Sequence, residues 1–211
     1  MMVKLIVFDC DGVLFDSRRA NQEYYNHLLR HFNHPPMSEE ELEYAHMHNA
    51  LDAIRHIFRH YPEDSPEEID TFRRAQGYEH VLPHMIMEED LVEFLDRVKG
   101  QLHLAISTNR GNTMMPLLRT FKLEGYFTKI VTSETARRPK PAPDGLDEIL
   151  EHFRCSPDEA IFIGDSIIDA EHAAACSVPL VAFKNPTLEA DYHVFSFMEI
   201  LTLPPLQNHL P

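Results

Sequence analysis

Two aspartates end the first apolar run of this chain. Asp9 and Asp11 follow the run Leu5–Phe8, with only Cys10 between them. A continuous run of Leu, Ile, Val and Phe is typical of a buried strand in a parallel sheet. Two carboxylates at its end repel each other in a cleft of low dielectric unless a cation lies there. Either the strand ends in solvent and the acids are ordinary turn residues, or it ends in a metal site.

Polar residues also follow three later apolar runs. The carboxyl ends of parallel strands meet at one edge of a sheet, so these side chains are expected to lie close to the two aspartates. Three carboxylates, a hydroxyl and a lysine would form an acidic pocket that could bind a metal ion, with the lysine as an additional positive charge. The residues are Ser107, Thr108 and Asn109 after the run from Leu102, Lys140 between two prolines after the run from Lys129, and Asp165 with Asp169 after the run from Ala160.

These residue types suit phosphoryl transfer. Carboxylate oxygens and a phosphate oxygen are the ligands that Mg²⁺ prefers. A carboxylate can attack phosphorus and give an aspartyl-phosphate. A second acid two residues further along an extended chain lies on the same side, where it could protonate the leaving oxygen. A lysine and a hydroxyl could then hold the transferring group.

The elements that must position these residues follow from the pattern of the chain. Five apolar runs, the last at 178–183, alternate with helical patterns such as 88–100. This alternation predicts an α/β fold with a doubly wound, Rossmann-like parallel sheet.

One interval breaks this rhythm, because about ninety residues separate the first two strands, far more than a crossover needs. Within it, 17–81 shows helical patterns and no strand-like run, with start signals at Ser38 with Glu41 and at Ser65 with Pro66. We therefore predict a core of 1–16 and 82–211 with an all-helical insert at 17–81.

Composition limits the classes of partner. The chain has 211 residues, 44% hydrophobic, and a net charge of −15, which argues against nucleic acid or an anionic membrane as a partner. Its three cysteines show no paired or metal-ligand spacing, which is typical of a reducing compartment. No secretory signal and no apolar stretch of about 20 residues is present. We expect a cytoplasmic protein that acts on a small molecule, and the oligomeric state is not indicated.

Four motifs together resemble those of a known family. "DCDGVLFDS", a strand ending in "STN", "RPKPAPD" and "GDSIID" stand in the order found in the haloacid dehalogenase-like superfamily, close to its phosphoglycolate-phosphatase-like branch. The resemblance covers essentially the whole chain. It implies a Rossmann-like core with a helical cap inserted after the first motif, where the strand-free interval lies.

The resemblance also implies a role for each matching residue. Asp9 would be the nucleophile, and Asp11 the general acid and base. Asp9, Asp165 and the Asp11 carbonyl would hold Mg²⁺, with Asp169 behind them. The remaining three, Thr108, the Asn109 amide and Lys140, would bind the phosphoryl oxygens and balance their charge. The implied activity is Mg²⁺-dependent hydrolysis of a small, phosphoglycolate-like phosphate ester through an aspartyl-phosphate.

Rival activities differ in what they require. A sugar phosphomutase uses the same four motifs and remains an alternative. A dehalogenase would not need an acid at position 11, and a phosphonate hydrolase would need a lysine in the cap, where 17–80 has none. A phospho-acceptor receiver module, a non-enzymatic alternative, carries its acceptor on the third strand and has no inserted cap.

The cap offers one polar stripe that could meet a substrate. His48, Asp52, Arg55 and Arg59 recur at helical spacing opposite the apolar stripe that includes Ile54. Such a stripe is either a solvated helix face or a contact surface. Arg55 or His48 is the predicted substrate contact, because a carboxylated substrate would suit a guanidinium group.

Overall fold

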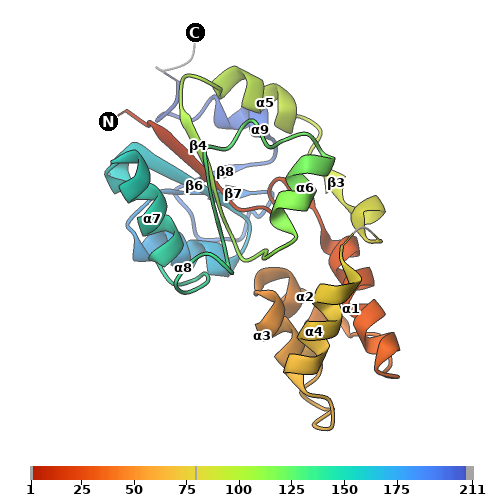
Figure 1. Cartoon of the computed structure of the whole chain (residues 1–211). Helices are drawn as coiled ribbons and strands as arrows, with labels where there is room; N and C mark the ends of the chain where they lie inside the picture. The colour runs from red at the N-terminus through yellow and green to blue at the C-terminus, as the bar shows by residue number, and fades with distance from the viewer. Residues whose placement is uncertain (1, 79, 208–211) are drawn as a thin grey trace.

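A six-stranded parallel sheet forms the centre of the molecule in the computed structural model, which describes residues 2–78 and 80–207 (Figure 1). Its strands lie in the order β5-β4-β1-β6-β7-β8, and each neighbouring pair is parallel. The α/β prediction is confirmed, and all five predicted strands are present. The bounds are Leu5–Phe8 (β1), His103–Thr108 (β4), Lys129–Thr132 (β5), Ala160–Gly164 (β6), Leu180–Phe183 (β7) and Tyr192–Val194 (β8). The unpredicted β8 has three residues, too few to leave a pattern.

Helices cover both faces of this sheet. Side chains alternate across a strand, and those of β1 enter two different hydrophobic clusters. Ile6 and Phe8 pack in the cluster that contains residues of α5, α6 and α9, whereas Leu5 and Val7 pack with α7 and α8. These helices span Leu91–Val98 (α5), Met114–Thr120 (α6), Asp144–Phe153 (α7), Ile167–Ala175 (α8) and Phe197–Ile200 (α9), and short 3₁₀ turns span Leu82–His84 (η1) and Pro157–Glu159 (η2).

Residues 18–76 form four helices that lie apart from the sheet (Figure 1). The predicted start signals are present: Ser38 and Glu41 form a reciprocal capping box, and Ser65 caps a helix that begins at Pro66. The helices are Arg18–His31 (α1), Glu39–Met47 (α2), Ala50–Ile57 (α3) and Pro66–Gln76 (α4). Two short antiparallel strands, Phe15–Asp16 (β2) and Ile86–Met87 (β3), join this region to the core. The division at 17 and 81 stays a prediction.

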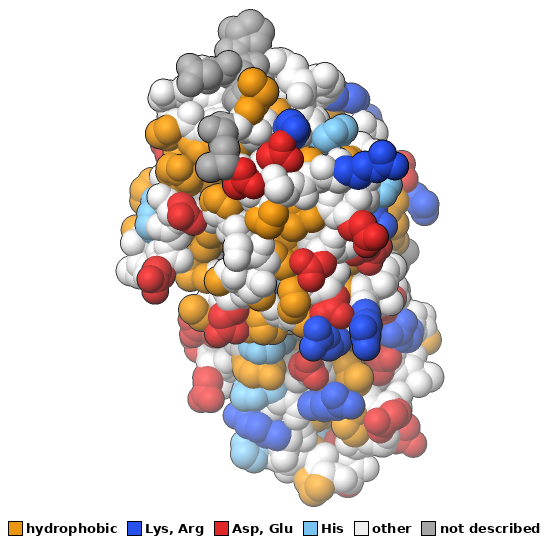
Figure 2. Space-filling model, turned by 90° about the vertical axis from the view of Figure 1, so that its left-hand side faces the viewer, with side chains coloured by type: hydrophobic (Ala, Val, Ile, Leu, Met, Phe, Trp, Pro, Cys, Tyr) orange, Lys and Arg blue, Asp and Glu red, His pale blue; other side chains and the backbone are white. Residues whose placement is uncertain are grey.

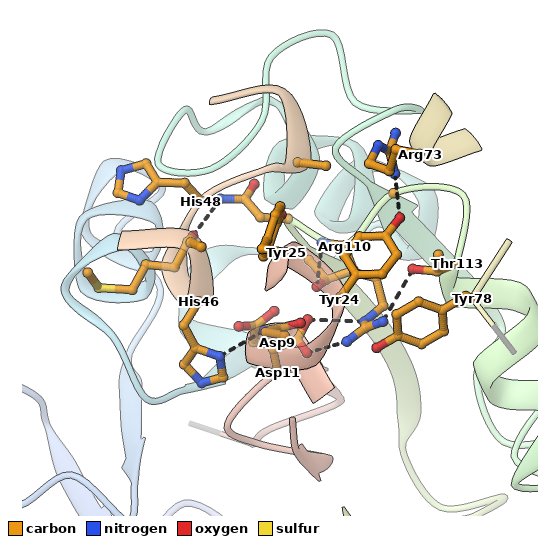
Figure 3. A pocket seen from close by; sticks show the side chains of 17 residues that line it. Asp9, Asp11, Tyr24, Tyr25, His46, His48, Arg73, Tyr78, Arg110 and Thr113 are labelled. Carbon is orange, nitrogen blue, oxygen red and sulfur yellow. Dashed lines mark hydrogen bonds and ion pairs between the residues drawn. The ribbon is translucent and has the colours of Figure 1, made fainter. Parts of the chain in front are cut away.

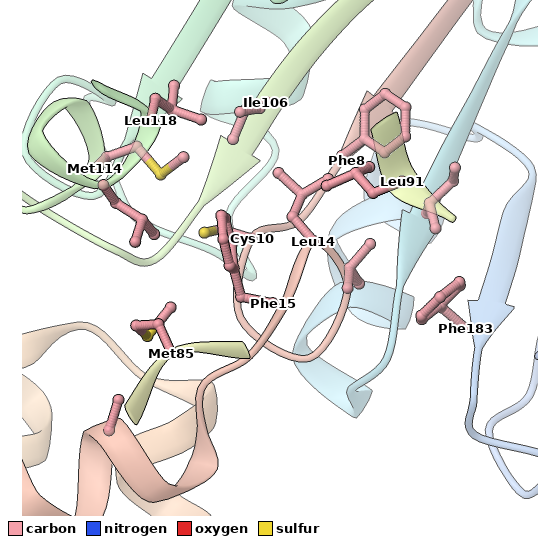
Figure 4. Packing of buried hydrophobic residues seen from close by; sticks show 14 of the residues in the cluster. Phe8, Cys10, Leu14, Phe15, Met85, Leu91, Ile106, Met114, Leu118 and Phe183 are labelled. Carbon is pink, nitrogen blue, oxygen red and sulfur yellow. The ribbon is translucent and has the colours of Figure 1, made fainter. Parts of the chain in front are cut away.

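Apolar side chains connect this junction to the sheet. Figure 4 shows Cys10 and Phe15 within the same cluster as Phe8 and Met85. Cys10 and Phe15 are fully buried. The turn after β1 is therefore anchored on its apolar side, which leaves Asp9 and Asp11 to face the other way.

The surface mixes charges of both signs. Figure 2 shows acidic and basic side chains interspersed over one face of the core and of the helical region beneath it. Within 2–78 and 80–207, no helix is long and apolar enough to cross a bilayer.

Candidate active site

Asp9 and Lys140 form a buried ion pair at the edge of the sheet. Asp9 directly follows β1, and Lys140 Nζ lies 2.8 Å from its Oδ1. Lys140 Nζ also donates to Asp169 Oδ1 at 2.6 Å. Burial raises the pKa of Asp9 to about 7, although Lys140 opposes the shift. Burial alone would lower the pKa of Lys140, but Asp169 and Asp9 outweigh it and raise that pKa. The lysine is therefore charged and shared between two carboxylates.

Asp169 is fully buried in the first turn of α8, where it organises the loop that carries Asp165. Its Oδ2 accepts hydrogen bonds from the backbone N–H groups of Asp165 and Ser166, each at 3.1 Å, and from the Ser166 hydroxyl at 2.7 Å. Burial would raise the pKa of Asp169, but Lys140 and the hydrogen bonds from Ser166 together outweigh it and lower that pKa. Asp169 thus fixes both Lys140 and the Asp165 loop.

Three carboxylates converge at this point in a way that suits a cation. One oxygen each of Asp9, Asp165 and Asp169 lies within 4.8 Å of the others. Burial and the neighbouring Asp169 raise the pKa of Asp165 well above its usual range. Gly12, at φ +79°, lies against Asp165, and a Cβ there would fall 2.0 Å from Asp165 Oδ2. An all-oxygen donor set with one lysine as counter-charge fits a hard divalent cation such as Mg²⁺.

Thr108 ends β4 and Asn109 follows it, beside this cluster, as predicted. Both are buried. Asn109 Nδ2 donates to the Lys140 carbonyl at 3.2 Å and to the Met47 carbonyl of α2 at 3.0 Å. Asn109 therefore connects the strand end both to the lysine loop and to the helical region. The Thr108 hydroxyl accepts a hydrogen bond from the Arg110 N–H at 3.2 Å.

A buried histidine, which the sequence did not point to, supports the lysine loop from behind. His172 Nδ1 lies 2.8 Å from the Ala142 carbonyl and Nε2 lies 3.0 Å from Ser107 Oγ. Because a carbonyl only accepts, Nδ1 carries the proton and Nε2 accepts from the serine. Burial lowers the pKa of His172 to about 4, so the ring is neutral. Ser107 is thus a structural partner of His172.

Asp11 meets an arginine that the sequence did not single out. Arg110 Nε donates to Asp11 Oδ2 at 3.1 Å, and Arg110 Nη2 donates to Asp11 Oδ1. Burial would raise the pKa of Asp11, but the guanidinium outweighs it and lowers that pKa. The only available sequence signal was a charge directly after the polar strand end Thr108–Asn109.

A cavity of about 50 Å³ separates these strand ends from the helices (Figure 3). Of the predicted contacts in the helical region, His48 lines this cavity, whereas Arg55 does not. The Arg55 side chain is 54% exposed and pairs with Asp52 on its own helix. The structure therefore brings Asp9, Asp11, Thr108, Asn109 and His48 to one cavity, with Lys140, Asp165 and Asp169 behind it, and leaves Arg55 outside.

Arg73 reaches the cavity from the helical region instead. Its side chain is 4% exposed, and it donates through Nε to Asp70 Oδ1 at 2.7 Å. Its Nη1 lies 3.4 Å from the Tyr24 hydroxyl and 3.5 Å from Asn112 Oδ1 of the core. Arg73 follows buried Ile69 by four residues, so a charge on the apolar stripe of α4 was the signal that could have found it.

The chain belongs to the haloacid dehalogenase-like hydrolases, whose family model matches residues 6–183. A solved family member from Geobacter sulfurreducens, a subfamily IA hydrolase, is 36% identical with a TM-score of 0.82, over 95% of this chain and 98% of that one. The predictions of this family and of a hydrolase enzyme are confirmed.

Curated relatives carry phosphatase names. A phosphoglycolate phosphatase from Chromobacterium violaceum is 28% identical over 95% of this chain and 96% of its own length. A pyrophosphatase from Bacillus velezensis is 25% identical over 79% of this chain and 76% of its own. The family and these relatives support the predicted phosphatase activity.

Proposed function

We propose that this protein is a Mg²⁺-dependent phosphatase that hydrolyses a small phosphorylated metabolite through an aspartyl-phosphate. The observation that carries the proposal is the buried Asp9 at a strand end, 2.8 Å from the shared Lys140 and grouped with two further carboxylates. The names of the phosphoglycolate phosphatase and pyrophosphatase relatives support a small substrate.

Each proposed step uses residues that line the cavity, together with Lys140 behind it. Asp9 attacks phosphorus, the ester P–O bond breaks, and the leaving oxygen takes a proton from the Asp11 carboxyl. Water then attacks the aspartyl-phosphate and returns a proton to Asp11, which releases inorganic phosphate and regenerates Asp9. Thr108, the Asn109 amide and Lys140 hold the phosphoryl oxygens during both steps.

Asp9, Asp165 and the Asp11 carbonyl would hold the metal. When bound, Mg²⁺ would favour the ionised form of these carboxylates and offset charge on the phosphoryl oxygens. Asp169 and Lys140 orient the loop and the nucleophile around it.

Substitution of the nucleophile tests the proposal. Asp9→Asn keeps the shape of the side chain but removes the attacking oxygen anion, so phosphate release should fall by roughly three orders of magnitude or more. The assay is phosphate release from a panel of small esters with Mg²⁺ and with excess chelator, and chelation should also abolish activity. Folding is checked by circular dichroism.

Activity of Asp9→Asn within tenfold of the wild type would contradict the mechanism. The phosphomutase alternative is tested in the same assay, because a mutase would convert a sugar 1-phosphate to its isomer with little release of phosphate.

A further inference from the structure

Three side chains of metal-ligand type converge in the helical region, away from the candidate active site. One ligand atom each of His34, Glu63 and Asp64 lies within 4.8 Å of the others. Among the residues that the structure describes, the other such group is the carboxylate cluster at the sheet edge. Figure 1 shows the loop between α3 and α4, which carries Glu63 and Asp64, at the end of the helical region farthest from the sheet. The proposed mechanism does not use these three residues.

The imidazole of His34 is held in one orientation by aromatic rings. It stacks on Tyr61, with ring centroids 3.5 Å apart and an interplanar angle of 12°, and it meets Phe58 edge-on at 5.7 Å. Its Nε2 contacts Asp64 Oδ2, and the His34 and Asp64 side chains are only 11% and 17% exposed. The backbone N–H of His34 donates to the Leu29 carbonyl at 2.8 Å, and that of Asp64 donates to the Tyr61 carbonyl at 3.1 Å. The nitrogen and the carboxylate are therefore positioned before any ion arrives.

The two carboxylates of this cluster are not balanced by a lysine or an arginine. Within 2–78 and 80–207, Asp64 pairs with His34, and neither Asp64 nor Glu63 pairs with a basic side chain of the other two types. Asp70, in the neighbouring helix α4, shows the contrast, because it pairs with both Arg73 and Arg74. Two carboxylates beside an imidazole form a site that favours a divalent cation over a single positive charge.

The donor types indicate which cations suit the site. An imidazole nitrogen together with carboxylate oxygens suits Zn²⁺ and other divalent transition-metal ions. Mg²⁺ and Ca²⁺ take oxygen ligands and gain little from a histidine. Three protein ligands leave room for water on the ion, so the affinity should be moderate, with a Kd of about 1 µM, and weaker than that of four-ligand zinc sites.

We propose that His34 Nε2, Glu63 and Asp64 bind one divalent transition-metal ion such as Zn²⁺, which joins the loop after α1 to the loop before α4. Nε2 must be unprotonated to act as a ligand, so the ring proton lies on Nδ1 in the bound state. The ion takes the place of the direct contact between His34 and Asp64. Because α4 carries Arg73, the ion would fix the start of a helix that reaches the cavity. The inference does not depend on the proposed phosphatase function.

Calorimetric titration of the metal-free protein with Zn²⁺, in excess Mg²⁺, tests the proposal. The wild type should bind one Zn²⁺ per chain at this site, and His34→Gln and Asp64→Asn should each weaken that binding about a hundredfold, because each removes one ligand. His60→Gln, at an exposed histidine of the same loop, is the matched control and should bind as the wild type does. Asp165→Asn should also keep this binding, since it changes only the sheet edge. Circular dichroism checks the folding of each variant.

Equal Zn²⁺ affinity in His34→Gln and the wild type would overturn the proposal, as would loss of the binding in Asp165→Asn. No Zn²⁺ binding by the wild type would mean that His34 and Asp64 form only an ion pair.

A second experiment uses the wild-type protein and so does not depend on the folding of a variant. Crystals soaked in Zn²⁺ should give an anomalous difference peak about 2.0–2.2 Å from His34 Nε2 and from oxygens of Glu63 and Asp64. Anomalous peaks at other positions alone would overturn the site.

Discussion

The core and the cap hold their buried cations differently. In the core, Lys140 contacts Asp9, which follows β1, and Asp169, in the first turn of α8, at 2.8 and 2.6 Å. In the cap, formed by α1 to α4, Arg73 pairs with Asp70 from its own helix, one turn earlier. Because its two partners are distant in the sequence and lie at the sheet edge, Lys140 is fixed to that edge. A local partner moves with Arg73, so the packing of the whole helix decides where this arginine points.

This difference predicts that the two regions control different kinetic constants. Groups fixed to the sheet edge meet the reacting phosphorus and should control kcat, whereas groups on a separate helical layer meet the rest of the substrate and should control KM. Substitutions in the two regions should therefore affect kcat and KM differently.

Lys140→Met should have the largest effect. It removes the cation that Asp9 and Asp169 share, so kcat should fall about a thousandfold. It should also destabilise the fold by roughly 3–5 kcal/mol, because buried carboxylates are left without a partner. Steady-state kinetics and chemical denaturation measure the two effects.

The matched control is Lys129→Met, since Lys129 pairs with Glu148 at the surface. A Lys140→Met protein with kcat within tenfold of the wild type would place the lysine outside the chemistry.

Substitution of His172 changes a residue that supports the lysine loop but contacts no reacting atom in the proposed mechanism. Its pKa falls from the ordinary 6.5 to about 4 in the folded state because the ring is buried. The unfolded chain therefore binds a proton between pH 6.5 and 4 that the folded chain does not, and stability falls as the pH falls through this window. The expected loss is about 3 kcal/mol.

His172→Gln keeps an N–H donor and an acceptor but cannot titrate, so its free energy of unfolding should depend less on pH across this window. Denaturation at several pH values, in parallel with His152→Gln at an exposed position of α7, measures the difference. Identical pH dependence in His172→Gln and the wild type would show that another group controls acid stability.

The sheet was predictable because its signals are local. Runs such as Leu5–Phe8 and Ala160–Gly164 are buried along their whole length and read as continuous apolar stretches. Helix α1 was not delimited, and β2 and β3 were missed, because two-residue strands leave no pattern and are formed by pairing between 15–16 and 86–87.

The core of the site was predictable for a related reason. Parallel strands end at one edge of the sheet, so polar residues at their carboxyl ends lie together at that edge, as Asp9, Thr108 and Asp165 do. Arg110 and His172 could not be predicted, since one charge and one histidine near the motifs have many possible partners. Their roles depend on contacts with Asp11, and with Ser107 and Ala142, that only the folded chain makes.

The cap residues that face the cavity could not be predicted, because periodicity shows which face of a helix is polar but not which face meets the core. α3 carries Arg55 on its polar face, and that face turns to solvent. α4 carries Arg73 on its buried face, and that face turns to the cavity. Of the polar stripe, His48 lines the cavity and Arg55 does not, whereas Arg73 lines it from within an apolar stripe.

The smallest expected effect separates these two arginines. Arg73→Ala removes a guanidinium from the cavity, so KM for 2-phosphoglycolate should rise about tenfold while kcat falls little, as for the loss of one charge-assisted contact. Arg55→Ala removes an exposed pair with Asp52, and such pairs contribute about 0–1 kcal/mol, so its KM should stay within about twofold of the wild type. Initial rates over a range of substrate concentrations measure both. A tenfold rise in KM for Arg55→Ala, with none for Arg73→Ala, would mean that the polar face of α3 closes over the substrate, and the contrast drawn between the two helices would have to be reversed.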